Sequence, residues 1–403
     1  MNSFIYKSGI KFLEIYLNVA SLVGNEKAKK AKIGRGFWKK DLSLIKKNKV
    51  TYWIHVASHG EAIMSLPIIE KIINKKDCQV AMSFFSSSGY ENFNFQNNNF
   101  YKFYLPLDKK KNCIELIEFI RPQILIFIKY DLWLNLINEC KKRGIPTLLV
   151  SGKFRKEQWY FKYYGAKARE ILKSMSYILT VDHSSEKLLL NNNFKNIKYC
   201  GDTRYDQVTE SKKNNISLII NNPCVILGSS WTKEEKYAAE IIEKTNDINW
   251  IIVPHEIQQH KLKKTKKLFG ENSSLLSNID LKKPIPKVLI IDEIGILSTL
   301  YNFSDIAFVG GGFSGKIHNI LEAGIKGNII IFGPKIEKYP EAKLLFNKNL
   351  AFKINNSKEL KNTIENLLKD PKELKRKQNK IIQIIEKQKG ATEKVWEEIE
   401  KIM

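Results

Sequence analysis

The chain has 403 residues, of which 43% are hydrophobic, and 67 Lys and Arg against 42 Asp and Glu give it a net charge of +25. This length favours two domains with buried cores. The charge favours a phosphate-bearing partner such as nucleic acid, anionic lipid or a nucleotide, unless the many Lys residues only fill the surface, as an AT-rich genome would produce. Five scattered cysteines without a CxxC pair argue against a disulfide framework and a zinc site, so we expect no metal, no cofactor and a reducing, cytoplasmic compartment.

The N-terminal segment is apolar, but Lys7, Lys11 and Glu14 make a full membrane span costly. Its apolar side chains fall on one helical stripe, formed by Phe12, Ile15, Tyr16, Val19 and Val23. A segment rich in Lys and Arg follows at residues 25–40. This pattern is typical of an amphipathic helix on an anionic membrane surface, and we predict that residues 1–40 associate with the membrane. The alternative is that the helix packs on its own domain.

Short apolar runs then alternate with longer amphipathic ones, which predicts parallel sheets covered by helices on both faces. The strands predicted in the first half are 50–58, 78–86, 100–108, 123–131, 146–152, 176–182 and 197–202. After a polar linker at 211–222, the second half predicts strands at 223–230, 248–256, 288–295, 305–312 and 328–334. We therefore expect an α/β protein with two Rossmann-like domains at 41–210 and 223–403, the second of which includes the terminal helices.

Polar loops follow most of these strands, and ligands of such sheets bind beyond the carboxyl ends of the strands. Two such domains imply a ligand cleft between them. In the first domain, Glu61 follows a Ser-His-Gly turn at the start of a helix. It is either a first-turn acid that the helix dipole favours or a catalytic base. Lys129, Asp131 and Arg204 stand at other strand ends.

The loop at 151–165 interleaves basic and aromatic side chains, a pattern that suits an amphiphilic anion or single-stranded nucleic acid. Within it Ser151 and Arg155 are candidate ligands of an acceptor substrate. Ser58 and Gly60, which flank the turn before Glu61, are the others.

In the second domain, a strand runs into three glycines and a loop, and Asn319 then opens a helix that carries Glu322. Glycines and a helix N-terminus suit a phosphate, while a tight turn with Asn319 as N-cap is the alternative. Ser229 and Ser230 end another strand, before a possible capping box formed by Thr232 and Glu235. A further strand ends in Pro254 and His255, and a lone histidine is more often structural than functional.

Together, these motifs resemble the 3-deoxy-D-manno-octulosonic acid (Kdo) transferases, GT-B glycosyltransferases that add Kdo to lipid A precursors. The segments that carry the resemblance are "HVASHGE", "KYDLW", "GDTRYD", "FVGGGFSGKIHNILEAG" and "FGPKIEKYPEA". They occur in the family's order, and the resemblance runs from the N-terminal helix to about residue 345. It implies a GT-B fold, with two Rossmann-like domains and an inter-domain cleft.

The resemblance also implies roles for individual residues. Glu61 matches the catalytic base, and Lys129 and Arg204 match positions that stabilise the transition state. Lys129 replaces a family Glu and Asp131 stands where a second one does, so either could take that role. The residues that match CMP-binding positions, or that end a strand beside them, are Ser229, Ser230, Pro254, His255, Gly295, Ile296, Leu297, Asn319, Ile320, Leu321 and Glu322. His255 replaces an Arg, and Ile296 a Glu.

The implied reaction is transfer of Kdo from CMP-Kdo to a lipid A precursor, with inversion at the anomeric carbon and without a metal. It implies a location on the cytoplasmic face of the bacterial inner membrane, and no nucleic acid as partner. Two alternatives remain: another GT-B transferase that uses a UDP-sugar, such as a lipid A disaccharide synthase, and a basic nucleic-acid-binding protein.

Overall fold

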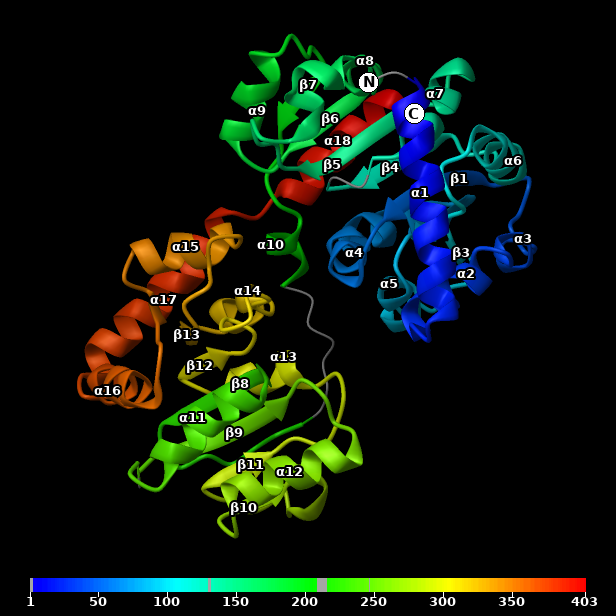
Figure 1. Cartoon of the computed structure of the whole chain (residues 1–403). Coiled ribbons are helices and arrows are strands. Elements are labelled where there is room, and N and C mark those ends of the chain that lie inside the picture. Colours follow the sequence, from blue (N-terminus) through cyan, green and yellow to red (C-terminus); the bar gives the residue numbers. More distant parts are fainter. Residues whose placement is uncertain (1–2, 130–131, 209–215, 246) are drawn as a thin grey trace. The chain divides into compact units, whose positions relative to one another are not determined.

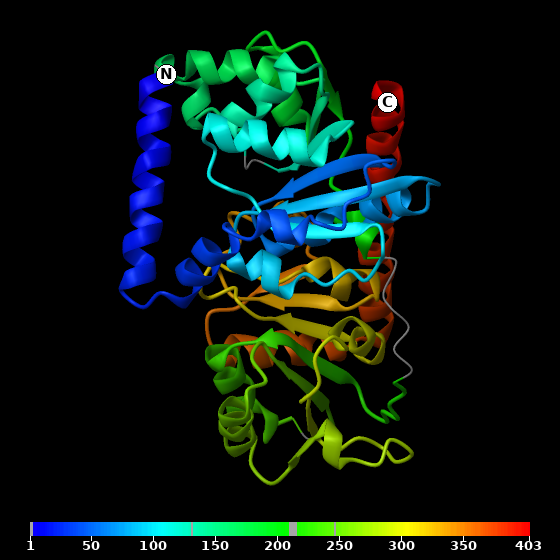
Figure 2. The same cartoon turned by 90° about the vertical axis from the view of Figure 1, so that its right-hand side faces the viewer.

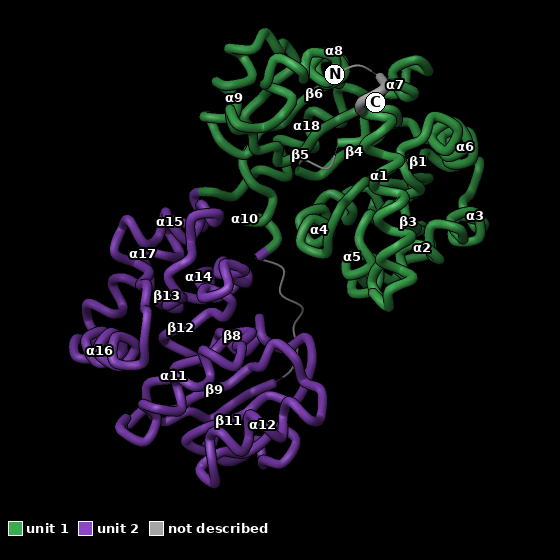
Figure 3. The backbone as a smooth tube through the Cα atoms, in the orientation of Figure 1, with its two compact units in different colours: residues 1–207, 388–403 green, residues 208–387 purple. Residues whose placement is uncertain are grey.

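The computed structural model describes residues 3–129, 132–208, 216–245 and 247–403, so Asp131 and linker residues 211–215 lie outside the described part. The chain folds into two compact units (Figures 1 and 3). Unit 1 comprises Met1–Gln207 with Gln388–Met403, and unit 2 comprises Val208–Lys387. Each unit is an α/β structure built on a parallel sheet, in agreement with the predicted fold class.

The sheet of unit 1 has seven parallel strands in the order β3-β2-β1-β4-β5-β6-β7. The strands are β1 (Val50–Val56), β2 (Cys78–Phe84), β3 (Phe100–Tyr104), β4 (Ile124–Ile128), β5 (Thr147–Gly152), β6 (Tyr177–Thr180) and β7 (Ile197–Tyr199). The helices are α1 (Ser3–Leu22), α2 (Glu26–Gly34), α3 (Trp38–Asp41), α4 (His59–Ile73), α5 (Ser87–Asn92), α6 (Lys110–Ile120), α7 (Leu134–Lys142), α8 (Ala166–Lys173), α9 (His183–Leu190), α10 (Arg204–Gln207) and α18 (Ala391–Ile402).

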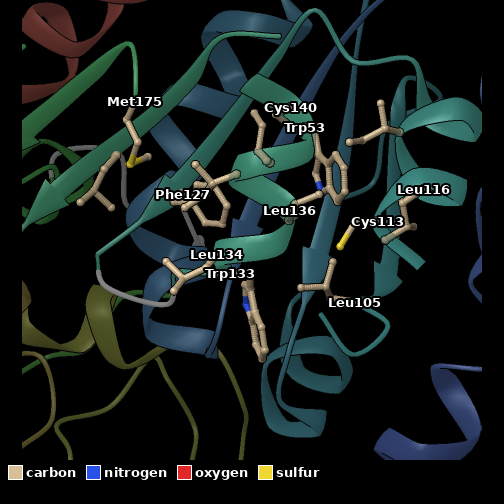
Figure 4. Packing of buried hydrophobic residues seen from close by; sticks show 14 of the residues in the cluster. Trp53, Leu105, Cys113, Leu116, Phe127, Trp133, Leu134, Leu136, Cys140 and Met175 are labelled. Carbon is tan, nitrogen blue, oxygen red and sulfur yellow. The ribbon is translucent and has the colours of Figure 1, made fainter. Parts of the chain in front are cut away.

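The central strands are apolar along their length because both faces of the sheet are covered. On β1, Trp53 packs into one core and Ile54 into the other. Figure 4 shows the first core, where Trp53 and Phe127 lie under the side chains of α7, among them Leu136. The second core lies between the sheet and α4 and includes Ile68. Two buried faces fix the register of the strands and hence the loops at their ends.

The last helix of the chain belongs to unit 1, whereas the sequence had led us to expect it in the second domain. Val395, Trp396 and Ile399 of α18 are buried in the second core of unit 1. The Trp396 ring stacks on Tyr52 of β1 at 6.5 Å between ring centroids. Asp206 fixes the start of α18, since its carboxylate accepts hydrogen bonds from the backbone N–H groups of Gly390 and Thr392, both at 2.6 Å.

Helix α1 runs along the outside of unit 1 (Figures 1 and 2) and is joined to it by polar contacts. The Tyr6 hydroxyl donates to the buried carboxylate of Asp108 at 2.6 Å, and Lys109 pairs with Glu14 at 2.7 Å. The predicted apolar stripe points away from these contacts. Its side chains are 52–77% exposed at Phe12, Ile15, Tyr16, Val19 and Val23.

The sheet of unit 2 has the order β10-β11-β9-β8-β12-β13-β14, again entirely parallel. The strands are β8 (Cys224–Ser230), β9 (Asn249–Pro254), β10 (Ser273–Leu275), β11 (Val288–Ile290), β12 (Ile306–Val309), β13 (Ile329–Phe332) and β14 (Ala351–Lys353). The helices are α11 (Thr232–Ile242), α12 (Gln259–Phe269), α13 (Leu297–Leu300), α14 (Ile320–Ile325), α15 (Pro340–Asn347), α16 (Ser357–Leu368) and α17 (Pro371–Lys387). The two edge strands β10 and β14 were not predicted from the sequence.

Candidate functional site

Each sheet has a switch point, where chain connections leave neighbouring strands in opposite directions and a crevice opens at the carboxyl ends. In unit 1 it lies between β1 and β4, which pair side by side. The loop after β1 carries Glu61, and Lys129 follows β4 directly. In unit 2 the switch point lies between β8 and β12. Ser229 and Ser230 end β8, and the glycine loop follows β12. Of the sequence-predicted residues, Glu61, Lys129, Ser229 and Ser230 therefore lie where each fold opens a ligand crevice.

Glu61 is buried in the first turn of α4, with 7% of its surface exposed. Its Oε2 accepts hydrogen bonds from the backbone N–H of Ala57 at 2.6 Å and of Ser58, the N-cap residue, at 3.2 Å. These bonds fix the orientation of the carboxylate. The backbone donors and the positive end of the helix also stabilise its negative charge. The prediction of a first-turn acid is confirmed, and this arrangement suits a base equally well.

The turn before Glu61 packs tightly against the residues that follow the neighbouring strand, β2. The backbone N–H of Ser86, after β2, donates to the carbonyl of Ala57 at 3.0 Å. Gly89 approaches so closely that a Cβ there would lie 3.1 Å from the Ser58 carbonyl carbon. His59 is half-buried, its Nδ1 has no hydrogen-bond partner among the described residues, and burial lowers the pKa of the imidazole. Gly60 is exposed at the surface of the turn.

Lys129 and Arg204 meet at a buried carboxylate, Asp202. Arg204 donates from Nε and Nη2 to Asp202 Oδ2 at 3.0 and 2.7 Å. Burial acts to raise the pKa of Asp202, but the charges of Arg204 and Lys129 and the hydrogen bonds from Arg204 hold it below its ordinary value. Lys129 has a left-handed backbone conformation, φ 67°, which a non-glycine residue adopts only when its surroundings demand it. Asp202 is thus a buried carboxylate that carries its negative charge beside these two cations.

The cation cluster is tied to the helix that carries Glu61. Thr203, between Asp202 and Arg204, donates from its hydroxyl to the carbonyl of Met64 on α4 at 2.9 Å. The two predicted catalytic loops thus belong to one rigid piece of unit 1. Asp202 was not among the predicted site residues. The sequence feature that could have identified Asp202 is the "GDTRYD" motif, in which this acid stands two residues before Arg204.

The structure does not bring Ser151 and Arg155 together. Ser151 is buried at the end of β5 with φ 54°, and its Oγ has no hydrogen-bond partner among the residues described. Arg155 is exposed, and its backbone N–H bonds to Gln158 Oε1 at 2.7 Å. Tyr160 of the same loop is buried, whereas Tyr163 is 92% exposed. The aromatic side chains of this loop therefore divide between the core and the surface.

In unit 2, Ser230 is buried and bonded within the fold. Its hydroxyl donates to Glu235 Oε1 at 2.9 Å, and Thr265 donates to Glu235 Oε2 at 3.1 Å. Burial raises the pKa of Glu235. Ser229 beside it has φ 51°, and a Cβ on Gly310 would lie 2.1 Å from the Ser229 carbonyl oxygen, so only glycine fits there.

The predicted capping box at Thr232 and Glu235 is wrong, because α11 begins one residue earlier than the sequence suggested. Trp231 is the N-cap residue, Thr232 is the first helical residue, and Glu235 turns to Ser230 and Thr265 instead.

A cavity of about 290 Å³ opens beside Ser230, and Pro254 and His255 also line it. His255 stacks on Trp231 at 4.4 Å between ring centroids, and His318 lies 4.5 Å from His255. The indole Nε1–H of Trp231 donates to His318 Nε2 at 3.2 Å. Burial lowers the pKa of both histidines, and with the added effect of His255 that of His318 falls to about 4. The predicted His255 thus belongs to a flat aromatic surface formed by the ends of three loops.

Asn319 is the N-cap of α14, which confirms the capping interpretation. Its Oδ1 accepts from the backbone N–H of Leu321 at 3.2 Å, and its Nδ2 donates to Glu322 Oε1 at 2.9 Å. Burial raises the pKa of Glu322. Ile320 and Leu321 are buried in the core of unit 2, so only their backbones are placed to meet a ligand.

The turn at Gly295–Leu297 enters α13. Gly295 has φ 90°, and Ile296 is buried with 3% of its surface exposed. Across the described residues, no group of three His, Cys, Asp or Glu side chains lies together in a way that could hold a metal ion.

Comparison with known proteins places this chain among sugar transferases. Residues 33–207 match the family described as 3-deoxy-D-manno-octulosonic-acid transferase (kdotransferase). A bifunctional glycosyltransferase/methyltransferase of Fusobacterium nucleatum is 26% identical over 80% of this chain, which spans 53% of that protein, about half its length. The 3-deoxy-D-manno-octulosonic acid transferase of Chlamydophila psittaci is 26% identical, and the alignment covers 86% of this chain and 83% of that protein. The enzyme of the same name from Aquifex aeolicus is 28% identical, and the alignment covers 82% of this chain and 90% of that protein.

Solved structures show the same fold at low sequence identity. A UDP-GlcNAc 2-epimerase from Neisseria meningitidis aligns with a TM-score of 0.60 at 13% identity, over 87% of this chain and all of its own. MurG from Acinetobacter baumannii aligns with a TM-score of 0.54 at 13% identity, over 88% of this chain and 99% of its own. The fold is therefore of the GT-B type. The chain is a glycosyltransferase that is similar to Kdo transferases along most of its length, and its residues 33–207 match the Kdo transferase family.

Proposed function

We propose that this protein transfers Kdo from CMP-Kdo to a lipid A precursor, lipid IVA, in lipopolysaccharide biosynthesis, with inversion and with Glu61 as general base. The observation that carries the proposal is the geometry around Glu61. A buried carboxylate, oriented by two backbone N–H groups, stands at the switch point of unit 1. The helix that carries it is hydrogen-bonded to Thr203, the residue before Arg204. A base in this position removes the proton from the acceptor hydroxyl as its oxygen attacks the anomeric carbon.

The donor in this proposal carries two negative groups, the carboxylate of Kdo and the phosphate of CMP. CMP leaves as a phosphate monoester, whose charge grows as the bond to the anomeric carbon breaks. Lys129 and Arg204, the two cations whose charges act on Asp202, are the residues proposed to stabilise this charge. Because the family resemblance places Lys129 at the position of a Glu, we propose that it binds the negative charge of the donor and does not act as an acid. Asp131 remains the alternative for the family's acidic role.

Unit 2 is proposed to bind the CMP part. Ser230, Pro254 and His255 line the cavity of about 290 Å³, and Asn319 caps the neighbouring loop. Since His255 replaces a permanently charged Arg of the family, we expect weaker phosphate binding at neutral pH than an arginine would give.

The acceptor would be reached at a membrane surface. The exposed apolar stripe of α1 is contiguous with the basic segment at residues 25–40, the combination that binds anionic bilayers. None of the described helices combines the length and the apolar character needed to cross a bilayer. We propose peripheral attachment on the cytoplasmic face of the membrane.

The test is incubation of the purified protein with CMP-Kdo, generated in situ, and lipid IVA, followed by mass spectrometry of the lipid. We expect a mass increase of one or more Kdo units. Nucleotide competition separates the UDP-sugar alternative. Protection of unit 2 from unfolding by CMP is expected, and protection by UDP alone would contradict the proposal. Tight, salt-sensitive RNA binding without transfer would favour the nucleic-acid alternative.

A further inference from the structure

Arg35, at the end of α2, reaches over the sheet edge of unit 1. Its Nε donates to the carbonyl of Leu105 at 3.1 Å and its Nη2 to the carbonyl of Phe85 at 2.7 Å. These carbonyls follow β3 and β2, so the guanidinium lies at the carboxyl ends of both strands. The preceding Gly34 permits this approach, because a Cβ there would lie 2.2 Å from the Tyr104 ring.

The charge of Arg35 has no anion to pair with among the described residues. Its two hydrogen bonds go to neutral carbonyls, and its third nitrogen, Nη1, is buried without a hydrogen-bond partner in the described part of the chain. Burial lowers the pKa of Arg35 to about 10, so the side chain stays charged at neutral pH. A partly buried cation with a buried, unused donor costs free energy unless an anion supplies the missing acceptor.

Arg35 lines a cavity of about 310 Å³ that has room for such an anion. Lys32 and Lys109 also line it, against one acid, Glu14, which Lys109 already binds at 2.7 Å. Leu17 of α1 adds an apolar wall. The cavity therefore presents an excess of positive charge beneath the helix whose opposite face is apolar and exposed.

We propose that this cavity binds a phosphate group of the membrane-embedded glycolipid acceptor, with Arg35 and Lys32 as its ligands. The inference rests on the proposed function. It gains support from the way Arg35 is connected to Glu61. Phe85, whose carbonyl Arg35 binds, donates its own N–H to Val56 at 3.1 Å, and Ala57 donates to Glu61. A phosphate held there anchors the acceptor on the same edge of the sheet as the proposed base.

The test measures binding and not turnover. The probe is lipid IVA in detergent micelles, titrated calorimetrically into the full-length protein, beside the same lipid after enzymatic removal of its phosphates. Loss of a charge-assisted hydrogen bond should weaken binding of the phosphorylated lipid about tenfold in Arg35→Gln and in Lys32→Gln. The dephosphorylated lipid should not distinguish these variants from the wild type.

Two matched variants control for charge. Arg169→Gln removes an arginine of unit 1 that also binds two carbonyls, those of Tyr160 and Lys162, away from the cavity. Lys110→Gln removes an exposed lysine on α6. Both should bind like the wild type. Equal losses in all four variants would reduce the effect to diffuse charge and overturn the site.

Because Arg35 also joins α2 to the strand ends, Arg35→Gln could fail to fold, whereas Lys32 is exposed and Lys32→Gln should fold normally. Unchanged affinity in Lys32→Gln and in a folded Arg35→Gln would sink the proposal. Inorganic phosphate that competes as tightly as the lipid would assign the cavity to free phosphate instead. Another outcome is that the protein binds the lipid in a way that depends on its phosphates and on Arg35, and yet transfers no Kdo. That result would support this site and would refute only the proposed reaction.

Discussion

Glu61 combines a structural and a proposed chemical role in one conformation. Its carboxylate closes the start of α4 on the N–H groups of Ala57 and Ser58, and the same bonds hold it at the switch point of the sheet. Because these hydrogen bonds already hold the carboxylate in place, it needs no rearrangement to act as a base.

Replacing Glu61 by Gln should separate these two roles. The amide oxygen can still accept from Ala57 and Ser58, so the fold and CMP binding should be retained, but the amide cannot take a proton. We expect the rate of Kdo transfer to fall by about 10²–10⁴-fold. Single-turnover transfer assayed by mass spectrometry, with circular dichroism as the control for folding, checks this. Retained turnover would falsify the assignment of the base.

His318 should make the stability of unit 2 depend on pH. Its pKa in the folded protein is about 4, because burial and the nearby His255 disfavour its charged form, whereas an unfolded histidine titrates near about 6.5. Between these values the unfolded chain binds more protons than the folded one. The stability contribution is therefore present above pH about 6.5 and is lost as the pH falls towards about 4.

Denaturant midpoints of unit 2 at pH 7 and pH 4.5 test this effect. The wild type should lose more stability between the two pH values than His318→Gln, since the variant lacks the side chain whose pKa is lowered most by folding. His260→Gln, on the exposed side of α12, should behave like the wild type. Equal losses in the wild type and in His318→Gln would contradict the prediction.

At the level of single residues, the sequence placed Glu61, Arg204 and His255 in the loops after predicted strands, and the family resemblance then suggested their roles. The same reasoning missed Asp202 and Arg35. Their importance comes from burial and from partners distant in sequence, such as Leu105 for Arg35. Ser151 and Arg155 stand four residues apart, but Ser151 is buried in strand β5 and Arg155 is exposed in the loop after it, which spacing alone does not reveal.

Among the elements, α1 departs most from ordinary packing. Leu13 and Ile10 face unit 1, while Phe12 and Val19 on the other side are 72% and 52% exposed. A stripe of this kind on a single chain is typical of an interaction surface. Its side chains contact no core, so they can be changed without cost to the fold.

The double variant Phe12→Glu, Val19→Glu should move the protein from the membrane pellet to the supernatant of a cell lysate. Two charges on the stripe remove apolar contact and repel anionic lipid. Leu190→Glu, on an exposed leucine of α9 that is 54% accessible, provides the control and should remain in the pellet. Unchanged sedimentation of the double variant would place the membrane contact elsewhere.

Strand prediction succeeded where the strands are buried on both faces and failed at the edges. β10 and β14 span three residues each and lack a long apolar run, so they depend on pairing with β11 and β13. The start of α11 was misplaced by one residue because Glu235 has tertiary partners that compete with helix capping.

At the scale of the whole molecule, α18 makes unit 1 discontinuous in sequence, because this last helix packs on the unit formed by the first half of the chain. Trp396 buries its ring against Tyr52 of β1, so the last residues stabilise the unit that contains the first ones. Replacing Trp396 by Ala should lower the free energy of unfolding of unit 1 by about 3–5 kcal/mol and leave unit 2 unchanged. Chemical denaturation followed separately in the two units measures this. Trp159→Ala, at a 37% exposed position of unit 1, should cost much less.

The sequence by itself determined the two α/β halves, the parallel strands and the strand-end loops, because buried parallel strands and amphipathic helices leave strong periodic patterns. Its motifs also pointed to the Kdo transferases before any comparison. Only the tertiary structure decided which unit α18 joins, which charges surround Asp202 and where Arg35 lies. These depend on contacts between residues far apart along the chain, as in Gly390 with Asp206 or Leu105 with Arg35, and no local pattern records them.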